Sequence, residues 1–266
     1  MKEKAKRYIR KIITLNDNRE IGGNFILWSF IKLFANIGKL SQAAAALTYH
    51  TLFAAVPIIA LMLATSTFMG YGDAFTRPDK AMGRQACENL SDSILMEGDY
   101  GAGCGATVGK LKGMEYCCNS GIGSWSEVTE NGIKVAALIA VNAFGDVYED
   151  GKIIAGTKND DGTFLPTEDG VIQMASSLSF SGQNTTIGII ATNVKLTKAQ
   201  AKKVAGMAHD GLARCIRPIH TTMDGDTLFC LSTEELELPT APVDVVGILA
   251  AKATEQAVIR AVRMAK

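Results

Sequence analysis

Residues 184–193 read NTTIGIIATN, and this run decides the fold of the second half of the chain. Ile and Thr favour extended backbone, and this uncharged strand is expected to be buried on both faces. Asn184 and Thr185 open the strand directly after the loose stretch SSLSFSGQ. A hydroxyl at such a junction can attack the carbonyl before it, break the chain and become an amino-terminal nucleophile whose own amine is the base. Position alone does not establish this chemistry.

The stretches around this strand alternate between strand and helix patterns. Residues 133–147 (IKVAALIAVNAFGDV) form a continuous apolar run of strand length, and residues 226–232 (DTLFCLS) form a third strand. Thr197 is placed to cap an amphipathic helix that Pro218 stops, and a final helix occupies about residues 243–264. Strands buried on both faces need helices outside them, so the sequence predicts a layered α/β structure.

The composition excludes several classes of protein. The 266 residues hold 27 Lys and Arg against 27 Asp and Glu. A general nucleic-acid binder needs a basic surplus to neutralise phosphates, so we expect no nucleic-acid partner. Six cysteines without a C-x-x-C pair are too few for a disulfide scaffold, and we expect them to be reduced.

The front of the chain has the pattern of a membrane segment. Residues 43–70 (AAAALTYHTLFAAVPIIALMLATSTFMG) carry no charged side chain, and about 20 apolar helical residues cross a bilayer core. A basic tail and an amphipathic stretch precede this run. We expect residues 1–70 to form a domain with a single transmembrane helix. A buried core helix of a soluble protein is the alternative.

Three motifs have ordinary structural explanations when each is taken alone. Residues 101–110 (GAGCGATVGK) match a loose dinucleotide-binding pattern, but no clear strand precedes them, and a structural turn is favoured. Asp224 and Asp226 could begin a metal site, yet two carboxylates rarely hold a metal without further ligands, so a turn is favoured. His209 and His220 fit a helix-surface and a loop histidine better than catalytic bases.

Taken together and in order, these segments resemble the DmpA/NylC-type self-cleaving aminopeptidases and amidases. The resemblance covers residues 71–266 and implies an N-terminal-nucleophile-like αββα sandwich acting on small peptides or short amides. It rests on GAGCGATVGKLKG, GIGSWS, VAALIAVNAFGDV, NTTIGIIATN and MAHDGLARCIRPIHTTMDGDTLF.

The resemblance implies a nucleophile and a cleavage site. Thr185 would be the nucleophile, exposed when the Asn184–Thr185 bond is cleaved, and its own α-amine would take the hydroxyl proton. Asn142 matches an asparagine that stabilises the oxyanion of the tetrahedral intermediate.

The resemblance also implies charged groups around that nucleophile. Lys110 matches a lysine that favours the neutral amine and stabilises developing negative charge. Asp224 and Asp226 match an acidic pair that orients the amino terminus and the nucleophile. This chemistry needs neither a metal nor an organic cofactor.

The sequence departs from this family at its front. LSQAAAALTYHTLFAAVPIIALMLA resembles the first spanning helix of the YihY/BrkB family of bacterial inner-membrane proteins. It stands where DmpA/NylC-type proteins carry further strands, so we expect an incomplete sandwich whose open edges favour a homo-oligomer.

These expectations place the protein in the bacterial inner membrane with a single span, or in the cytoplasm if residues 43–70 are not a true span. A catalytically inactive, membrane-anchored chimera is the alternative to a self-cleaving hydrolase. A YihY/BrkB-type membrane fragment with an unrelated tail is a third alternative.

Overall fold

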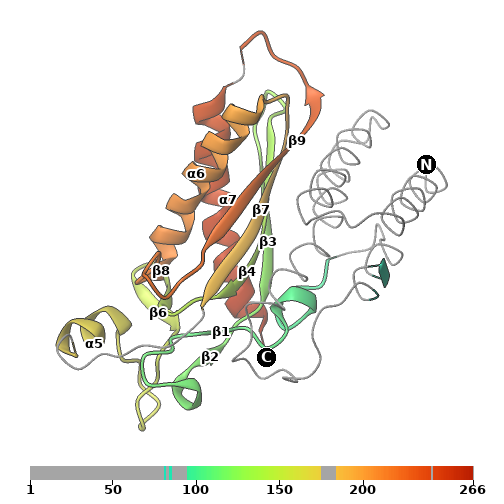
Figure 1. The fold of residues 1–266 in the computed structure, drawn as a ribbon. Helices are drawn as coiled ribbons and strands as arrows, with labels where there is room; N and C mark the ends of the chain where they lie inside the picture. Colours follow the sequence, from blue (N-terminus) through green and yellow to red (C-terminus); the bar gives the residue numbers. More distant parts are fainter. Residues whose placement is uncertain (1–80, 82–83, 86–94, 175–183, 241, 266) are drawn as a thin grey trace, which may run out of the picture.

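The computed structural model describes residues 81, 84–85, 95–174, 184–240 and 242–265 (Figure 1). Short 3-10 turns occupy Gly101–Gly103 and Met114–Tyr116. The strands and helices, in chain order, are β1 (Thr107–Val108), β2 (Cys118–Asn119), β3 (Ile122–Val128), β4 (Lys134–Asn142), β5 (Asp146–Glu149), β6 (Lys152–Ala155), α5 (Thr167–Gln173), β7 (Thr185–Val194), α6 (Lys198–Cys215), β8 (Ile216–Arg217), β9 (Thr227–Leu236) and α7 (Val243–Met264).

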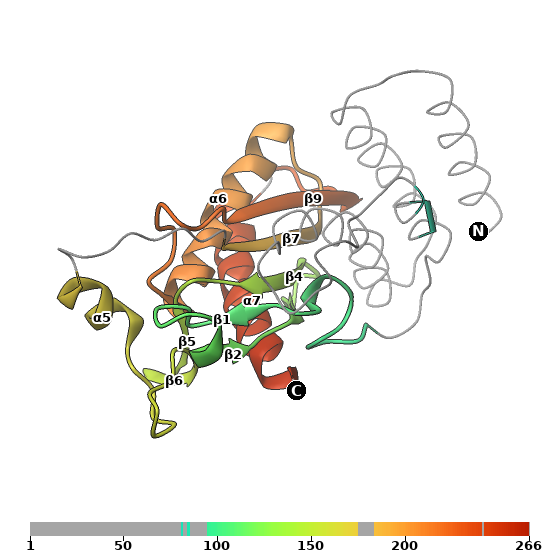
Figure 2. The ribbon, with the colours of Figure 1, turned by 60° about the horizontal axis from the view of Figure 1, so that its bottom comes forward.

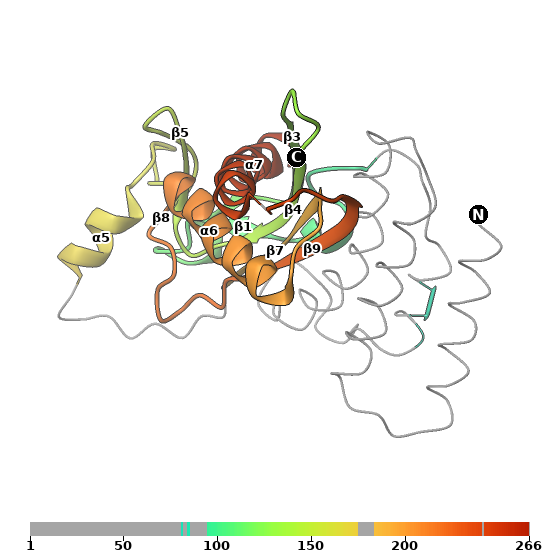
Figure 3. The same cartoon turned by 90° about the horizontal axis from the view of Figure 1, so that it is seen from above.

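The main sheet has the strand order β3-β4-β7-β9. Strands β3, β4 and β7 pair antiparallel, and β9 runs parallel to β7. Figure 3 shows α6 and α7 side by side on one face of this sheet. Two small sheets, β1-β2 and β6-β5-β8, lie at one end, and α5 lies beyond β6, away from the main sheet (Figure 2).

Both faces of the main sheet are apolar, as residues 184–193 indicate. Alternate β4 side chains, such as Val135 and Ile139, pack with α6 and α7 in the larger core cluster. The β4 side chains between them, such as Leu138, belong to a second cluster on the opposite face, together with Ile187 and Ile189 of β7. This alternation follows from the two-residue period of a strand.

The prediction of one strand over residues 133–147 was wrong in its extent. Strand β4 ends at Asn142, and β5 begins at Asp146 in the small sheet. The chain turns at Gly145, where an added Cβ would lie 2.1 Å from the carbonyl oxygen of Pro218. Close approach of two backbones therefore bends a stretch that hydrophobicity alone presents as continuous.

The predictions of β7, of the Thr197 cap of α6 and of α7 are confirmed. Strand β7 matches residues 185–193 with one residue added, and α7 matches residues 243–264. Helix α6 begins after Thr197, whose hydroxyl accepts the Gln200 amide, while the Gln200 side chain accepts the Thr197 amide. This capping box satisfies two amides that the first helical turn would leave unpaired. The five cysteines in the described part of the chain are free.

The α/β class is confirmed, whereas the αββα sandwich stays a prediction. A second sheet packed face to face on β3-β4-β7-β9 is not found among the described residues. The expected membrane segment, residues 43–70, and the rest of the predicted domain 1–70 lie outside the described residues. Of the helices that the structure describes, none is long and apolar enough to cross a membrane.

Two glycines of α6 give a matched pair of stability predictions. At Gly211 an added Cβ would lie 2.2 Å from the Ala251 carbonyl oxygen of α7, so Gly211→Ala should lower the free energy of unfolding by about 1–3 kcal/mol. At exposed Gly206 an added Cβ would meet nothing within 4 Å. Gly206→Ala should therefore raise that free energy by about 0.5–1 kcal/mol. Urea unfolding of both variants checks the pair, and a stable Gly211→Ala protein would contradict the close α6–α7 contact.

Candidate active site

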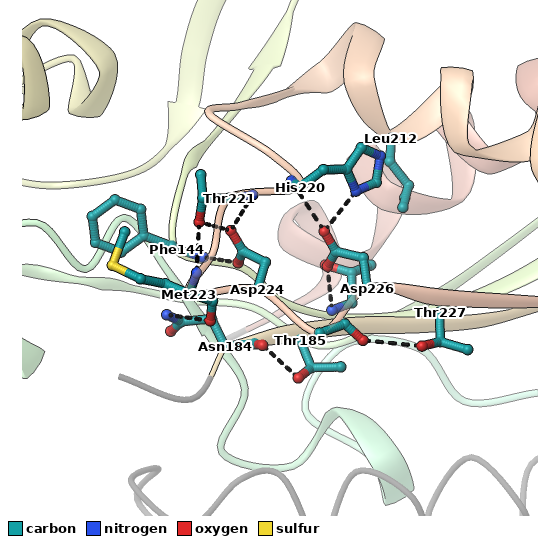
Figure 4. Close-up of polar contacts among 12 residues, drawn as sticks. Phe144, Asn184, Thr185, Leu212, His220, Thr221, Met223, Asp224, Asp226 and Thr227 are labelled. Carbon is teal, nitrogen blue, oxygen red and sulfur yellow. Dashed lines mark hydrogen bonds and ion pairs between the residues drawn. The ribbon is translucent and has the colours of Figure 1, made fainter. Parts of the chain in front are cut away.

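The predicted site residues meet at one end of the main sheet. Asn142, the last residue of β4, is paired with Thr185, the first residue of β7. Asn184, directly before β7, forms an isolated parallel bridge with Asp224 in the loop that leads into β9 (Figure 4). The sheet register therefore brings together residues that lie far apart in the sequence.

The Asn184–Thr185 peptide is held from several sides. The Asn184 amide donates to the Met223 carbonyl at 3.1 Å, and the Asn184 carbonyl accepts the Gly225 amide at 2.8 Å. The Thr185 hydroxyl Oγ1 contacts the same Asn184 carbonyl oxygen (Figure 4). Both residues are buried, with exposed fractions of 5% for Asn184 and 8% for Thr185. The hydroxyl thus lies against the carbonyl that precedes it, and that carbonyl is already polarised by an N–H group.

Lys110 reaches this peptide from the glycine-rich segment. Its Nζ donates to the Asn142 side-chain oxygen at 2.6 Å, to the Asn142 carbonyl at 3.2 Å and to the Asn184 side-chain oxygen at 3.1 Å. Burial lowers the pKa of Lys110 to about 8, against the opposing effects of the nearby charges of Cys117 and Asp224. The ammonium group therefore joins both asparagines at the end of the sheet.

The glycine-rich segment is a structural turn, as favoured from the sequence. It consists of a 3-10 turn followed by β1, without the strand-turn-helix order of a dinucleotide site. Gly109 has a φ of +73°, and an added Cβ would lie 2.0 Å from backbone atoms of residues 156 and 157. Its amide donates to the Gly145 carbonyl, and the Lys110 amide donates to the Phe144 carbonyl. The turn therefore serves to place Lys110.

Asn142 has a side chain whose two ends can do different chemistry. Its side-chain oxygen accepts from Lys110 and, at 3.2 Å, from the Thr107 amide. Because the oxygen holds these donors, the Nδ2 group is the end that could donate to a developing oxyanion. This arrangement suits the role that the resemblance implies for Asn142.

The two aspartates bind the chain around Thr185 and make no described hydrogen bond to Thr185 itself. Asp224 accepts the Phe144 amide at 3.2 Å and the Thr221 hydroxyl at 2.6 Å. Burial raises the pKa of Asp224, and the neighbouring Asp226 adds to the rise, while the bonds from Thr221 and Phe144 oppose it. Within the described residues, no group of three or more His, Cys, Asp or Glu side chains is placed to hold a metal ion.

Asp226 connects β7 to a histidine that the sequence did not single out for this site. One carboxylate oxygen accepts the Thr186 amide at 2.8 Å. The other accepts the His220 amide at 3.2 Å and lies 2.9 Å from Nδ1 of the His220 ring (Figure 4). The expectation of a loop histidine describes its position correctly, but not its contact with Asp226. The nearness of His220 and Asp226 on either side of a turn is the sequence signal that could have indicated it.

Comparison with known proteins adds a family to this geometry. A family model described as Peptidase family S58 matches residues 70–266. An uncharacterised aminopeptidase of Mycobacterium leprae is 37% identical over 190 residues, which cover 66% of this chain and 50% of that protein. The 6-aminohexanoate-oligomer endohydrolase of Paenarthrobacter ureafaciens is 30% identical over 193 residues, covering 66% of this chain and 51% of that enzyme. The chain spans about half the length of these curated relatives.

A solved structure is also similar to the chain. It is the L-aminopeptidase D-Ala-esterase/amidase of Ochrobactrum anthropi, at 23% identity and a TM-score of 0.49. The match covers 70% of this chain and 50% of that one.

Proposed function

Because this chain belongs to peptidase family S58, we propose that it is an N-terminal-nucleophile amide hydrolase that matures by cleaving its own Asn184–Thr185 bond. The observation that carries the proposal is the contact of the Thr185 hydroxyl with the Asn184 carbonyl oxygen, which also accepts the Gly225 amide at 2.8 Å. The Thr185 hydroxyl as nucleophile, the Asn184 carbonyl as its target and the Gly225 amide as oxyanion donor would thus act together at one peptide bond.

Self-cleavage would proceed from this arrangement in two steps. Thr185 Oγ1 attacks the Asn184 carbonyl carbon, and the negative charge that forms on the carbonyl oxygen is stabilised by the Gly225 N–H. The C–N bond then breaks, the hydroxyl proton passes to the leaving nitrogen, and an ester joins Asn184 to the Thr185 oxygen. Water hydrolyses this ester, which leaves a carboxylate at Asn184 and a free α-amine at Thr185.

Amide hydrolysis would use the same atoms after cleavage. The Thr185 amine takes the hydroxyl proton while Oγ1 attacks the substrate carbonyl. Asn142 Nδ2 is the donor for the substrate oxyanion, and removal of one such donor costs about 100- to 1,000-fold in rate. Lys110, which donates to Asn142 and Asn184, supplies positive charge at this end of the sheet. That charge keeps the Thr185 amine neutral and active as a base.

The substrate class proposed is small peptides and related short amides. Two features support it, namely the aminopeptidase relatives and the relative named for 6-aminohexanoate oligomers. A homo-oligomer and a membrane anchor at residues 43–70 stay predictions. The inactive chimera stays the alternative.

Hydrolysis should depend on prior self-cleavage. Freshly purified protein, incubated with aminoacyl p-nitroanilides and with 6-aminohexanoate dimer, should release product at a rate that rises in proportion to the cleaved fraction. The free Thr185 amine exists only in cleaved chains, which is the reason for the proportionality. Samples taken over time for both mass analysis and product release check this. Hydrolysis by a wholly uncleaved sample would contradict the proposed mechanism.

A further inference from the structure

Asp224 and Asp226, the acidic pair beside Thr185, each lie near a cationic or hydrogen-bonding group. That group is Lys110 for Asp224 and His220 for Asp226. Asp224 and Asp226 lie near enough for the charge of Asp226 to affect Asp224, and the charge of Asp224 acts on Lys110. The side chain of Asp226 is buried, with only 2% of its surface exposed. A buried carboxylate needs hydrogen-bond donors, and His220 supplies two of them.

The contacts of Asp226 form a clamp between a loop and the start of β7. His220 holds one oxygen with its amide at 3.2 Å and with its ring Nδ1 at 2.9 Å. The other oxygen accepts the amide of Thr186, the residue directly after Thr185. Asp226 therefore transmits the position of the His220 ring to the backbone that carries the Thr185 hydroxyl.

The His220 ring lies beside His209 of α6. The ring centroid of His209 lies 4.9 Å from that of His220, and burial lowers the pKa of His209, with the neighbouring His220 as a second cause. The charges of Asp226 and Asp210 act on His209 in the opposite direction. His220 keeps 39% of its side chain exposed, so its ring contacts solvent on one side and the buried carboxylate on the other.

We propose that His220 is a positioning residue for the nucleophile: its Nδ1–H holds Asp226, and Asp226 holds the Thr186 amide, so that the Thr185 hydroxyl stays against the Asn184 carbonyl group that it attacks. His220 touches neither the scissile bond nor a reacting atom in this scheme. The inference rests on the proposed self-cleavage, and it adds a residue outside the set that the sequence indicates.

The first test measures self-cleavage in His220 variants. His220→Ala should slow cleavage at Asn184–Thr185 by about 10- to 100-fold. A shift of the nucleophile by about 1 Å lowers the reaction rate by a factor of this order. His220→Asn should restore most of the rate, since its Nδ2 group can donate to Asp226 from nearly the same place. The matched control is His209→Asn, which removes the neighbouring ring but leaves the His220–Asp226 bond, and should cleave within about threefold of wild type. Equal losses in His220→Asn and His220→Ala, or a full loss in His209→Asn, would overturn the proposal.

The second test does not depend on cleavage. In a Thr185→Ala background, which keeps the chain whole, amide hydrogen exchange at Thr186 should quicken by about 10-fold or more when His220 is changed to Ala. Exchange at Ile190, in the middle of β7, should stay unchanged. Unchanged exchange at Thr186 would overturn the positioning role. A wild-type chain that fails to cleave would refute the proposed function instead, and exchange at Thr186 would still decide the role of His220.

Discussion

Replacement of Thr185 by alanine is expected to abolish cleavage at Asn184–Thr185 and to lower amide hydrolysis by at least about 1,000-fold. The change removes the only atom that the mechanism uses as nucleophile, while β7 keeps its pairing with β4. Thr185→Ser should still cleave, because it keeps the hydroxyl. Intact-mass analysis of each variant after purification provides the measurement.

Thr186 offers a matched control for this experiment. Its side chain is fully buried, and its hydroxyl has no hydrogen-bond partner among the described residues. Thr186→Val keeps the shape and the backbone amide that Asp226 binds, so it should cleave at close to the wild-type rate. Cleavage of Thr185→Ala at Asn184, or loss of cleavage in a folded Thr186→Val protein, would contradict Thr185 as the nucleophile.

Replacement of Lys110 by methionine is expected to slow both cleavage and hydrolysis by about 100- to 1,000-fold. The change removes the ammonium group that donates to Asn142 and Asn184 and leaves an apolar chain of similar length. Lys112→Met is the control: Lys112 lies two residues away, against the Tyr116 ring and 3.9 Å from Asp160. Rates of self-cleavage and product release in the two variants compare a site lysine with a neighbouring lysine. Equal rates would contradict a role for Lys110.

The pH dependence of Lys110 follows from its burial. Because its pKa is lowered to about 8, Lys110 is charged at pH 7 and loses its proton as the pH rises through about 8. The proposed mechanism uses the charged form of Lys110, so wild-type rates should fall above about pH 8, and Lys110→Arg should move that fall to higher pH. The free energy of unfolding should change with pH in the opposite direction to the rate. The lowered pKa means that the folded state disfavours the protonated form of Lys110. The contribution of Lys110 to stability should therefore increase between about pH 8 and its unfolded value of 10.5.

Local sequence patterns were sufficient to identify β7 and α6. Strand β7 follows from its Ile and Thr content, and α6 follows from the Thr197 cap and an apolar stripe that includes Val204 and Leu212. The site residues could be named because the resemblance supplied them. The sheet register, which brings Asn142 opposite Thr185, places them at one end of the sheet.

The features that the sequence did not indicate depend on contacts between distant segments. The bend after Asn142 results from the close approach of Gly145 to Pro218, which hydrophobicity does not record. The role of His220 depends on a buried carboxylate six residues away, whose other oxygen is bound to β7. The amide of Gly225, which donates to the Asn184 carbonyl, is a backbone group and has no side-chain signature.

Intact-mass analysis of the freshly purified wild-type chain tests the central claim most directly. Self-cleavage predicts two polypeptides, residues 1–184 and residues 185–266, whose masses together exceed that of the precursor by one water. The second of these should begin with Thr185. A single chain of 266 residues, or cleavage at any other bond, would contradict maturation at Asn184–Thr185 and favour the inactive chimera.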